Sequence, residues 1–552
     1  MNRTLAILSL DGKNITFSPA NDHWRKMRRL ATLHLLSAKN LQNSLHVREE
    51  EIRDMLDAIA ADATMSTSDV IKTGAAAMGG TAKSAAEAQE GVELRRYLNR
   101  ATLSNIMRLT VGKRFGYSSI RGAAGTTPKA ILEAAMRIDW NERIAAISGE
   151  KRGGEIRSGA AGAAAAPAVR SEETECSTAA KTNFSSSMEE AEGEVAFAII
   201  EEGFALAGAF NIADYVPWLS YWDPLRMYTR AQRLAPQLHG FMRACIAERR
   251  ALVRQKKCPE ESRRENLLAP GTLAATTAGP AVIEPEGLKG HDETALVDAL
   301  FETEGEGEDQ MDKDEILMLA IDMMMAGTDT TSKTVEWALA ELAQHPAMLE
   351  TLRAEVDAAY ARSANAAAET GTAAAAGSGV MVSLPVAEMP YLQAVLKETL
   401  RHHPVAPFLV PHQTTGSVTL GGYHIPPNTM VQINAWALAH DPTVWINPHK
   451  FDPSRFLDPA APDVTGQNFS LLPFGSGRRG CLGTNLGLDL SARLLANFVL
   501  RFNFKLPEDV RAAGGMDMME TFGLTMALAK PLRLVLRERK AVAGAAVAAS
   551  GA

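Results

Sequence analysis

Cysteine is scarce in this chain, and no long hydrophobic run is present. The 552 residues include four cysteines, too few and too scattered for a disulfide framework, which favours a reducing compartment. The longest apolar run, 316–326, is interrupted by Asp322 and is shorter than the roughly 18 residues that span a bilayer. The first ten residues have no cleavage pattern. We therefore expect neither a transmembrane segment nor a signal peptide in this sequence.

The chain also lacks an excess of positive charge. Lys and Arg number 57 and Asp and Glu 65, so the formal net charge is −8. This balance excludes a general affinity for nucleic acid and names no ligand. At 46% hydrophobic residues, the chain can bury a sizeable core.

Several stretches contain few large apolar side chains. They lie near residues 74–91, 149–188, 258–290 and 363–379, and a similar tail covers 541–552. Such segments cannot offset the entropy of ordering them by burial. We interpret them as surface insertions and a disordered tail, with linkers between separate domains as the alternative.

Helical periodicity dominates the remaining sequence. Apolar residues recur at helical spacing over 22–36, 41–60, 93–111, 193–210, 224–256, 312–341, 346–361, 389–401 and 485–501. Strand patterns are fewer and lie late, at 418–425, 430–433 and around 502–506 and 532–536. The predicted fold class is mainly α with small β-sheets.

A glycine-rich loop, residues 473–483 (PFGSGRRGCLG), delivers Cys481 immediately before a predicted helix. Glycines allow positive φ angles, so backbone N–H groups can point at the sulfur, and the helix N-terminus adds positive potential. Both effects favour a thiolate that binds a metal. Arg479 can pair with a carboxylate of a flat cofactor. One alternative is an ordinary buried cysteine. Another is a dinucleotide-binding turn, because Gly475, Gly477 and Gly480 also spell GxGxxG.

The same loop resembles the heme-ligand signature of the cytochrome P450 family, with all five fixed positions present: Phe474, Gly477, Arg479, Cys481 and Gly483. The resemblance extends over about residues 15–536 and is greatest to the microsomal, plant-type branch. It implies the P450 fold in a single heme-thiolate domain. It further implies heme b with an axial thiolate from Cys481, and cofactor contacts from Phe474, Gly475, Arg479 and Gly483.

A second matching segment is AGTDTT, residues 326–331, inside a long helical pattern. Glycine followed by hydroxyl residues is poor helix material, so we expect a local kink or a widened turn. By resemblance, this groove holds O2 over the heme. Thr330 then donates a hydrogen bond to the oxygen, and Asp329 helps to deliver protons.

Two further groups match the family. Glu398 and Arg401 lie at i,i+3 on a predicted helix, and the resemblance implies a buried structural triad with Arg455. Trp24 and Arg28 match the helix that contacts the heme propionates, and His412 is a further candidate donor to a propionate.

The resemblance also implies partners and a location. Electrons would come from NADPH through a separate NADPH-cytochrome reductase, a flavoprotein, because no flavin domain is recognisable here. One atom of O2 would be inserted into a C–H bond of a lipophilic small molecule, either phenolic and flavonoid-like or a fatty acid. An apolar pocket would be lined by Ala320, Met323 and Met324, by residues 405–409 and by residues 522–525. Membrane association and the cytosolic face of the endoplasmic reticulum membrane are expected from the family, although this chain shows no anchor.

Compared with microsomal relatives, the chain begins close to the Trp24 helix. We therefore expect it to lack the N-terminal anchor, the first helix and part of the N-terminal sheet, through either a truncated gene model or a shortened protein. Two alternatives to the monooxygenase remain open. One is a heme-thiolate isomerase or dehydratase of hydroperoxides, which the Asp329–Thr330 pair disfavours. The other is a truncated, non-catalytic remnant.

Overall fold

The structure, a computed structural model, describes residues 3–77, 91–117, 128–148, 178–209, 211–212, 218, 222–257, 294–305, 310–369 and 383–539. Most of the predicted insertions and the tail at 541–552 lie outside these residues. Where their ends are described, they are largely helical: 74–77 belong to α4, 178–188 to α9 and 363–369 to α14. The predicted insertions therefore extended too far into their flanking helices.

Helices make up most of the described chain, in agreement with the predicted fold class. The α-helices are α1 (Arg3–Leu8), α2 (Asp22–Ala31), α3 (Ala38–Asn43), α4 (Leu45–Ala77), α5 (Arg95–Val111), α7 (Pro128–Ala135), α8 (Trp140–Ser148), α9 (Thr178–Gly208), α10 (Met227–Lys257), α12 (Leu296–Glu302), α13 (Lys313–Gln344), α14 (Pro346–Glu369), α15 (Pro390–His402), α16 (Ala435–Ala439), α17 (Thr484–Arg501) and α18 (Glu508–Ala512). A π-helix, η1 (Thr32–Leu36), continues α2, and short 3-10 helices are η6 (Val386–Glu388), η7 (Pro453–Leu457) and η8 (Gly477–Arg479).

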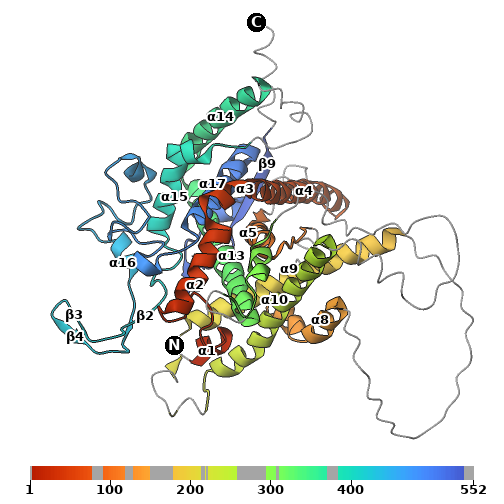
Figure 1. Cartoon of the computed structure of the whole chain (residues 1–552). Helices are drawn as coiled ribbons and strands as arrows, with labels where there is room; N and C mark the ends of the chain where they lie inside the picture. The colour runs from red at the N-terminus through yellow and green to blue at the C-terminus, as the bar shows by residue number, and fades with distance from the viewer. Residues whose placement is uncertain are drawn as a thin grey trace, which may run out of the picture.

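The sheets are small, as the sequence predicts. The strands are β1 (Val92–Glu93), β2 (His412–Gln413), β3 (Val418–Leu420), β4 (Tyr423–Ile425), β5 (Met430–Val431), β6 (Phe502–Lys505), β7 (Glu520–Thr521), β8 (Ala527–Leu528) and β9 (Arg533–Glu538). β1, β9 and β6 form one antiparallel sheet, and β2–β5, β3–β4 and β7–β8 form antiparallel pairs. The strand predicted over 418–425 is in fact a hairpin, because Gly421 and Gly422 both have positive φ and reverse the chain. Figure 1 shows this hairpin projecting from the helical body.

Helix α13 runs through the middle of the molecule, with α5 beside it (Figure 1). Its first turn is closed by a capping box in which the Asp312 carboxylate accepts from Glu315 N–H and the Glu315 carboxylate accepts from Asp312 N–H. The apolar residues of 316–324 belong to one hydrophobic cluster, shared with α10 and α12. The apolar residues of 335–342 belong to another, shared with α14, α15 and α17. The AGTDTT segment therefore lies where the two clusters meet.

The widened turn predicted around Gly327 does not occur, because α13 is α-helical without interruption through residues 313–344, all of which are described. Instead, the Thr328 and Thr330 hydroxyls donate to the carbonyls of Met324 and Ala326, four residues back, at 2.7 Å each. Gly327 is needed for a different reason. A Cβ at this position would lie 2.8 Å from the Ile106 side chain of α5, so the glycine permits the close approach of the two helices.

Buried carboxylates join α13 to distant segments. Asp322 is 7% exposed and accepts hydrogen bonds from the Ile15 N–H at 2.6 Å, the Asn14 amide at 3.0 Å and the Thr16 hydroxyl at 3.1 Å. Burial raises the pKa of Asp322 to about 6, although these donors lower it. The N-terminal segment is thus attached to the central helix through one titratable group.

We expect Asp322 to make stability depend on pH. Because its folded pKa lies above its ordinary value, its contribution is fully present below about pH 4 and is lost as the pH rises through about 6, a change on the order of 3 kcal/mol. Asp322→Asn cannot ionise. The difference in midpoint temperature between the wild type and Asp322→Asn should therefore become less favourable to the wild type from pH 4.5 to pH 7.5.

Asp314→Asn is the matched control, since Asp314 lies on the same helix but is exposed. Its difference from the wild type should change little over the same pH range. A constant difference for Asp322→Asn, or one that moves in favour of the wild type with rising pH, would contradict the assignment.

Candidate functional site

The Cys481 loop is built from a tight turn followed by a helix. Gly475 and Gly477 have φ of +68° and +66°, a region that favours glycine, so these two positions have the backbone conformation that the sequence predicts. The Cys481 N–H donates to the Phe474 carbonyl at 2.9 Å and closes the turn. Helix α17 begins at Thr484, and its N-cap, Gly483, has an ordinary φ of −86°. The loop therefore holds Cys481 just before a helix N-terminus.

The thiol of Cys481 is accessible at its surface but is otherwise surrounded by protein. This desolvation raises its pKa, whereas the Gly483 N–H, the Thr484 hydroxyl and the charge of Arg28 act in the opposite direction. The loop and the helix N-terminus therefore favour the anion, as predicted, while burial of the free thiol opposes it. A metal cation bound to the sulfur would remove its proton.

Basic and aromatic side chains gather beside the loop. The guanidinium of Arg479 lies over the Trp24 ring at 4.5 Å, and that of Arg28 lies 5.3 Å from the same ring. Arg28 donates to the Gly480 carbonyl at 3.0 Å, and Arg479 donates to the carbonyls of Ile15 and Ser18 at 3.2 and 2.5 Å. Four predicted site residues, Trp24, Arg28, Arg479 and Cys481, thus come together around one ring and one loop.

The indole of Trp24 provides a test of whether an anionic cofactor fits here. Trp24 is 5% exposed, and its Nε1–H has no hydrogen-bond partner among the described residues. A buried donor without a partner costs about 1–3 kcal/mol, so such an atom calls for an acceptor. A cofactor carboxylate beside Arg28 and Arg479 would supply one. The residues present therefore fit heme and its propionates.

His412 is the remaining residue that was predicted to donate to a propionate. It is an exposed residue of β2, opposite Val431 of β5. No contact joins its imidazole to Trp24, Arg28 or Arg479 in the described part of the chain. A cavity of about 360 Å³ between α8 and α10, lined by Trp140, Gly240 and Arg243 among others, contains none of the predicted site residues.

Asp329 and Thr330, the residues predicted to act on bound O2, lie on α13. Asp329 is 2% exposed, and its Oδ2 accepts from the Lys333 ammonium at 2.5 Å and from the Thr525 hydroxyl at 2.6 Å. Thr330 is partly buried and donates to the Ala326 carbonyl. Sequence reasoning missed Lys333, although its i,i+4 spacing from Asp329 is the signal that could have found it. Asp329 is held by an ion pair and a hydroxyl rather than standing alone.

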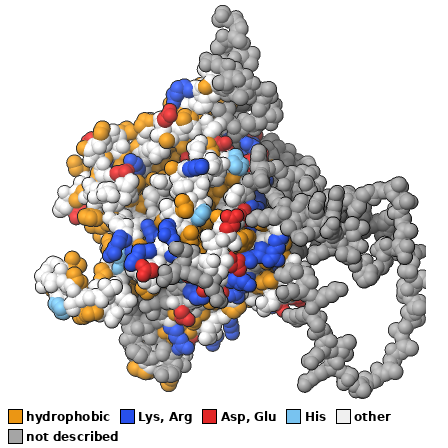
Figure 2. All heavy atoms as spheres, in the orientation of Figure 1, with side chains coloured by type: hydrophobic (Ala, Val, Ile, Leu, Met, Phe, Trp, Pro, Cys, Tyr) orange, Lys and Arg blue, Asp and Glu red, His pale blue; other side chains and the backbone are white. Residues whose placement is uncertain are grey.

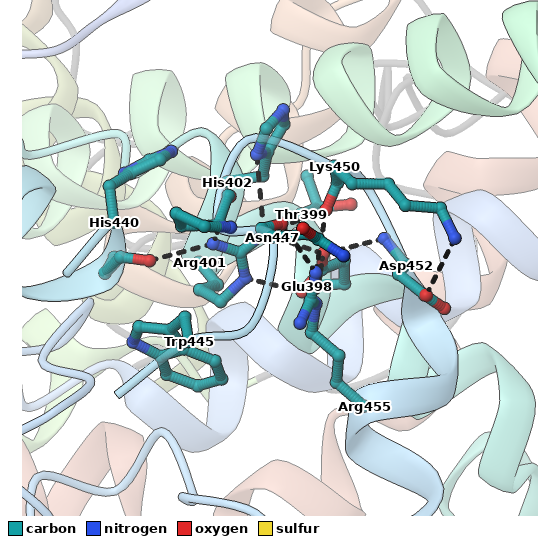
Figure 3. Close-up of polar contacts among 12 residues, drawn as sticks. Glu398, Thr399, Arg401, His402, His440, Trp445, Asn447, Lys450, Asp452 and Arg455 are labelled. Atoms are coloured by element: carbon teal, nitrogen blue, oxygen red, sulfur yellow. Dashed lines mark hydrogen bonds and ion pairs between the residues drawn. The ribbon is translucent and has the colours of Figure 1, made fainter. Parts of the chain in front are cut away.

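Glu398 and Arg401 of α15 meet Arg455 of η7, as Figure 3 shows. Glu398 and Arg401 are both 0% exposed, and they form a bidentate pair at 2.7 and 2.8 Å. The Glu398 carboxylate also accepts from the Asp452 N–H at 2.7 Å and from Arg455 at 3.4 Å. Arg401 donates further to the carbonyls of Ala439 and Pro448 at 2.8 and 2.9 Å. The pair therefore anchors the loops that follow α16 to the end of α15.

Comparisons with known proteins agree with this geometry. The family model described as Cytochrome P450 matches residues 2–121 and 167–528, most of the chain. The chain belongs to the cytochrome P450 family. This P450 is 29% identical over 538 residues to Cytochrome P450 98A2 of Glycine max, covering 98% of this chain and 78% of the relative. It is 32% identical over 337 residues to the flavonoid 3',5'-hydroxylase CYP75B138 of Crocosmia x crocosmiiflora, covering 60% of this chain and 55% of the relative.

A solved structure supports the fold alone. A zebra fish cytochrome P450, titled as a structure with progesterone, aligns with a TM-score of 0.54 and 20% identity, over 97% of this chain and 87% of the other. The P450 is thus of plant type, and it is a monooxygenase that acts on paired donors and incorporates oxygen from O2. Its cofactor is heme with a cysteine thiolate as axial ligand. The family generally uses a redox partner and binds lipophilic substrates.

We expect Glu398→Gln to destabilise the fold strongly. Removing one partner of a buried pair leaves the Arg401 charge uncompensated, at a cost of about 3–5 kcal/mol. The measurement is the denaturant midpoint, together with the yield of soluble protein.

Glu508→Gln is the control, because Glu508 and Arg511 form an exposed pair at the same i,i+3 spacing on α18. Its cost should stay below about 1 kcal/mol. Equal destabilisation by the two substitutions would contradict a special role for the buried pair.

Proposed function

We propose that residues 15–536 form a single heme-thiolate domain in which Cys481 is the axial ligand. The observation that carries this assignment is the unpartnered Trp24 Nε1–H beside Arg28, Arg479 and the Cys481 loop. The other described cysteine, Cys245, is buried in α10, and burial raises its pKa to about 12. When bound, the heme supplies O2 activation, which inserts one oxygen atom into a substrate C–H bond.

The chain's own residues would hold the heme and transfer protons. Trp24, Arg28 and Arg479 would hold the propionates, and the Cys481 loop would position the sulfur. On α13, the Thr330 hydroxyl would give up its bond to the Ala326 carbonyl to hold a proton near the reacting oxygen. Asp329, fixed by Lys333 and Thr525, would pass protons inward from the ion pair.

The substrate is proposed to be a lipophilic small molecule, phenolic and flavonoid-like or a fatty acid. Two of the predicted lining segments adjoin each other, since the Met526 N–H donates to the Val405 carbonyl and the rings of Phe408 and Phe522 meet edge to face at 5.9 Å. Phe522 is 66% exposed and offers an aromatic surface. The plant flavonoid hydroxylase among the relatives supports the phenolic choice.

Electrons are proposed to come from NADPH through a separate NADPH-cytochrome reductase. Figure 2 shows Lys and Arg side chains gathered on the face where α2 lies in Figure 1. Arg25, Arg29 and Arg478 are exposed there or on the adjoining Cys481 loop, and a basic surface steers an acidic partner. The resemblance to microsomal relatives supports a location at the cytosolic face of the endoplasmic reticulum membrane. Among the described helices, none is both long and apolar enough to cross a membrane.

The reduced carbon monoxide complex tests the assignment of Cys481. The wild-type protein should give the strongly red-shifted Soret band of thiolate-ligated heme, and Cys481→Ala should abolish it because the thiolate is lost. Cys245→Ala, which removes the other described thiol, should keep the band. Retention of the band by Cys481→Ala, or its absence from the wild type, would reject the proposal.

Thr330→Ala should uncouple NADPH consumption from product formation, because the proton-holding hydroxyl is removed. More hydrogen peroxide and less product per NADPH are expected, measured with reductase and a phenolic or fatty acid substrate.

Thr334→Ala is the control, since Thr334 lies one turn further along and its hydroxyl bonds to the backbone in the same way. Unchanged coupling in Thr330→Ala would argue against this role. Product formed from a hydroperoxide without reductase would favour an isomerase instead.

A further inference from the structure

Histidines gather at the ends of α13 and α15, away from the Cys481 loop. Glu341, His402 and His403 each offer a ligand atom, and the three atoms lie within 4.8 Å of one another. Glu341 and His403 are buried, and His402 is partly buried. This is the one group of its kind among the residues that the structure describes.

His403 is held between two carboxylates. Its Nε2 lies 2.7 Å from the Glu341 Oε1, and its Nδ1 lies 3.2 Å from the Glu520 Oε1 on β7. A histidine ligand usually donates its second ring N–H to a carboxylate, which fixes the ring for coordination. The ring is also stacked on Trp337, with centroids 3.9 Å apart and planes 6° apart. His403 is therefore oriented toward Glu341 by three separate contacts.

His402 completes the donor set. Its Nε2 lies 3.9 Å from the same Glu341 oxygen. In Figure 3 its ring points away from Glu398, with one nitrogen joined to Arg401. That contact, from Arg401 Nη2 to His402 Nδ1, is long at 3.4 Å.

We propose that Glu341, His402 and His403 bind a divalent zinc-like cation through one carboxylate oxygen and the two Nε2 atoms, with water as the fourth ligand. Two histidines and a glutamate form a known zinc donor set. The cation takes the place of the proton between His403 and Glu341. This site is separate from the heme, and the inference does not depend on the proposed function.

Binding requires modest rearrangement. Bonds of about 2.1 Å in tetrahedral geometry place ligand atoms about 3.4 Å apart, so the His403–Glu341 distance opens slightly and His402 moves inward. The Nδ1 of His402 must then carry the ring proton, and its contact with Arg401 is lost. Arg401 keeps its bonds to Glu398, Ala439 and Pro448, so the buried pair stays satisfied.

The surrounding charges permit a cation here. Glu341 and Glu520 supply two carboxylates, and the other oxygen of Glu341 lies 3.4 Å from His345. Arg401 and Lys450 are the nearby opposing cations, and both are directed at other acceptors. The bound cation would join α13, the end of α15 and β7, three segments far apart in the sequence.

Calorimetric titration of the tag-free holoprotein with ZnCl2, after treatment with a chelator, tests the site. Elemental analysis counts zinc and heme iron separately. The wild type should bind one zinc per chain, and His402→Leu should bind it about 10–100-fold more weakly or not at all. His424→Leu, which removes an exposed histidine of β4, should bind like the wild type.

A second variant guards against misfolding of the first. Glu520→Gln alters only the partner of the His403 Nδ1, on a residue that is partly exposed, and should weaken zinc binding about tenfold. X-ray absorption at the zinc edge should show two imidazoles in the wild type and one in His402→Leu. Equal affinities in the wild type and His402→Leu, or equal binding of Mg²⁺, which prefers oxygen ligands, would overturn the proposal.

Discussion

A buried carboxylate is tolerated only when it is paired or hydrogen-bonded, because its desolvation costs several kcal/mol. Helix α13 buries five of them, and four lie at intervals of seven residues, which is close to two helical turns: Glu315, Asp322, Asp329 and Glu336. Each is satisfied from elsewhere in the chain. Glu315 is paired with His23 and Lys26, and Asp322 is bonded to residues 14–16. Asp329 is bonded to Thr525 and Lys333, and Glu336 to Arg95 and the Leu532 N–H. This requirement fixes both ends of the sequence against one central helix.

Local elements could be predicted from sequence, because periodicity and turn chemistry are local properties. The helix predicted over 312–341 occupies 313–344, and that over 485–501 occupies 484–501. Gly475 and Gly477 have the positive φ that their loop needs. The failures have local causes as well. Compositional bias hid the helical ends of the insertions. Helix α13 is regular where a widened turn was expected, and its threonine hydroxyls donate to the backbone of the same helix.

Long-range pairing could not be predicted in the same way. Arg479 was assigned to a cofactor, yet it also donates to the carbonyls of Ile15 and Ser18, more than 450 residues away. Thr525 meets Asp329 only because β7 and β8 bring that turn back to α13. The charge state of Cys481 depends on how much protein surrounds it, which no motif encodes. The sequence therefore identified site residues by their residue type, whereas their hydrogen-bond partners are known only from the folded structure.

The segment between α1 and α2 has no helix or strand of its own, but it touches both sides of the candidate site. Asn14, Ile15 and Thr16 hold Asp322 of α13, and the carbonyls of Ile15 and Ser18 hold Arg479 of the Cys481 loop. Surface loops usually accept insertions and exchange sequence freely. The length of this segment is instead set by the two sites that it connects, and so is the identity of the Asn14 and Thr16 side chains that donate to Asp322.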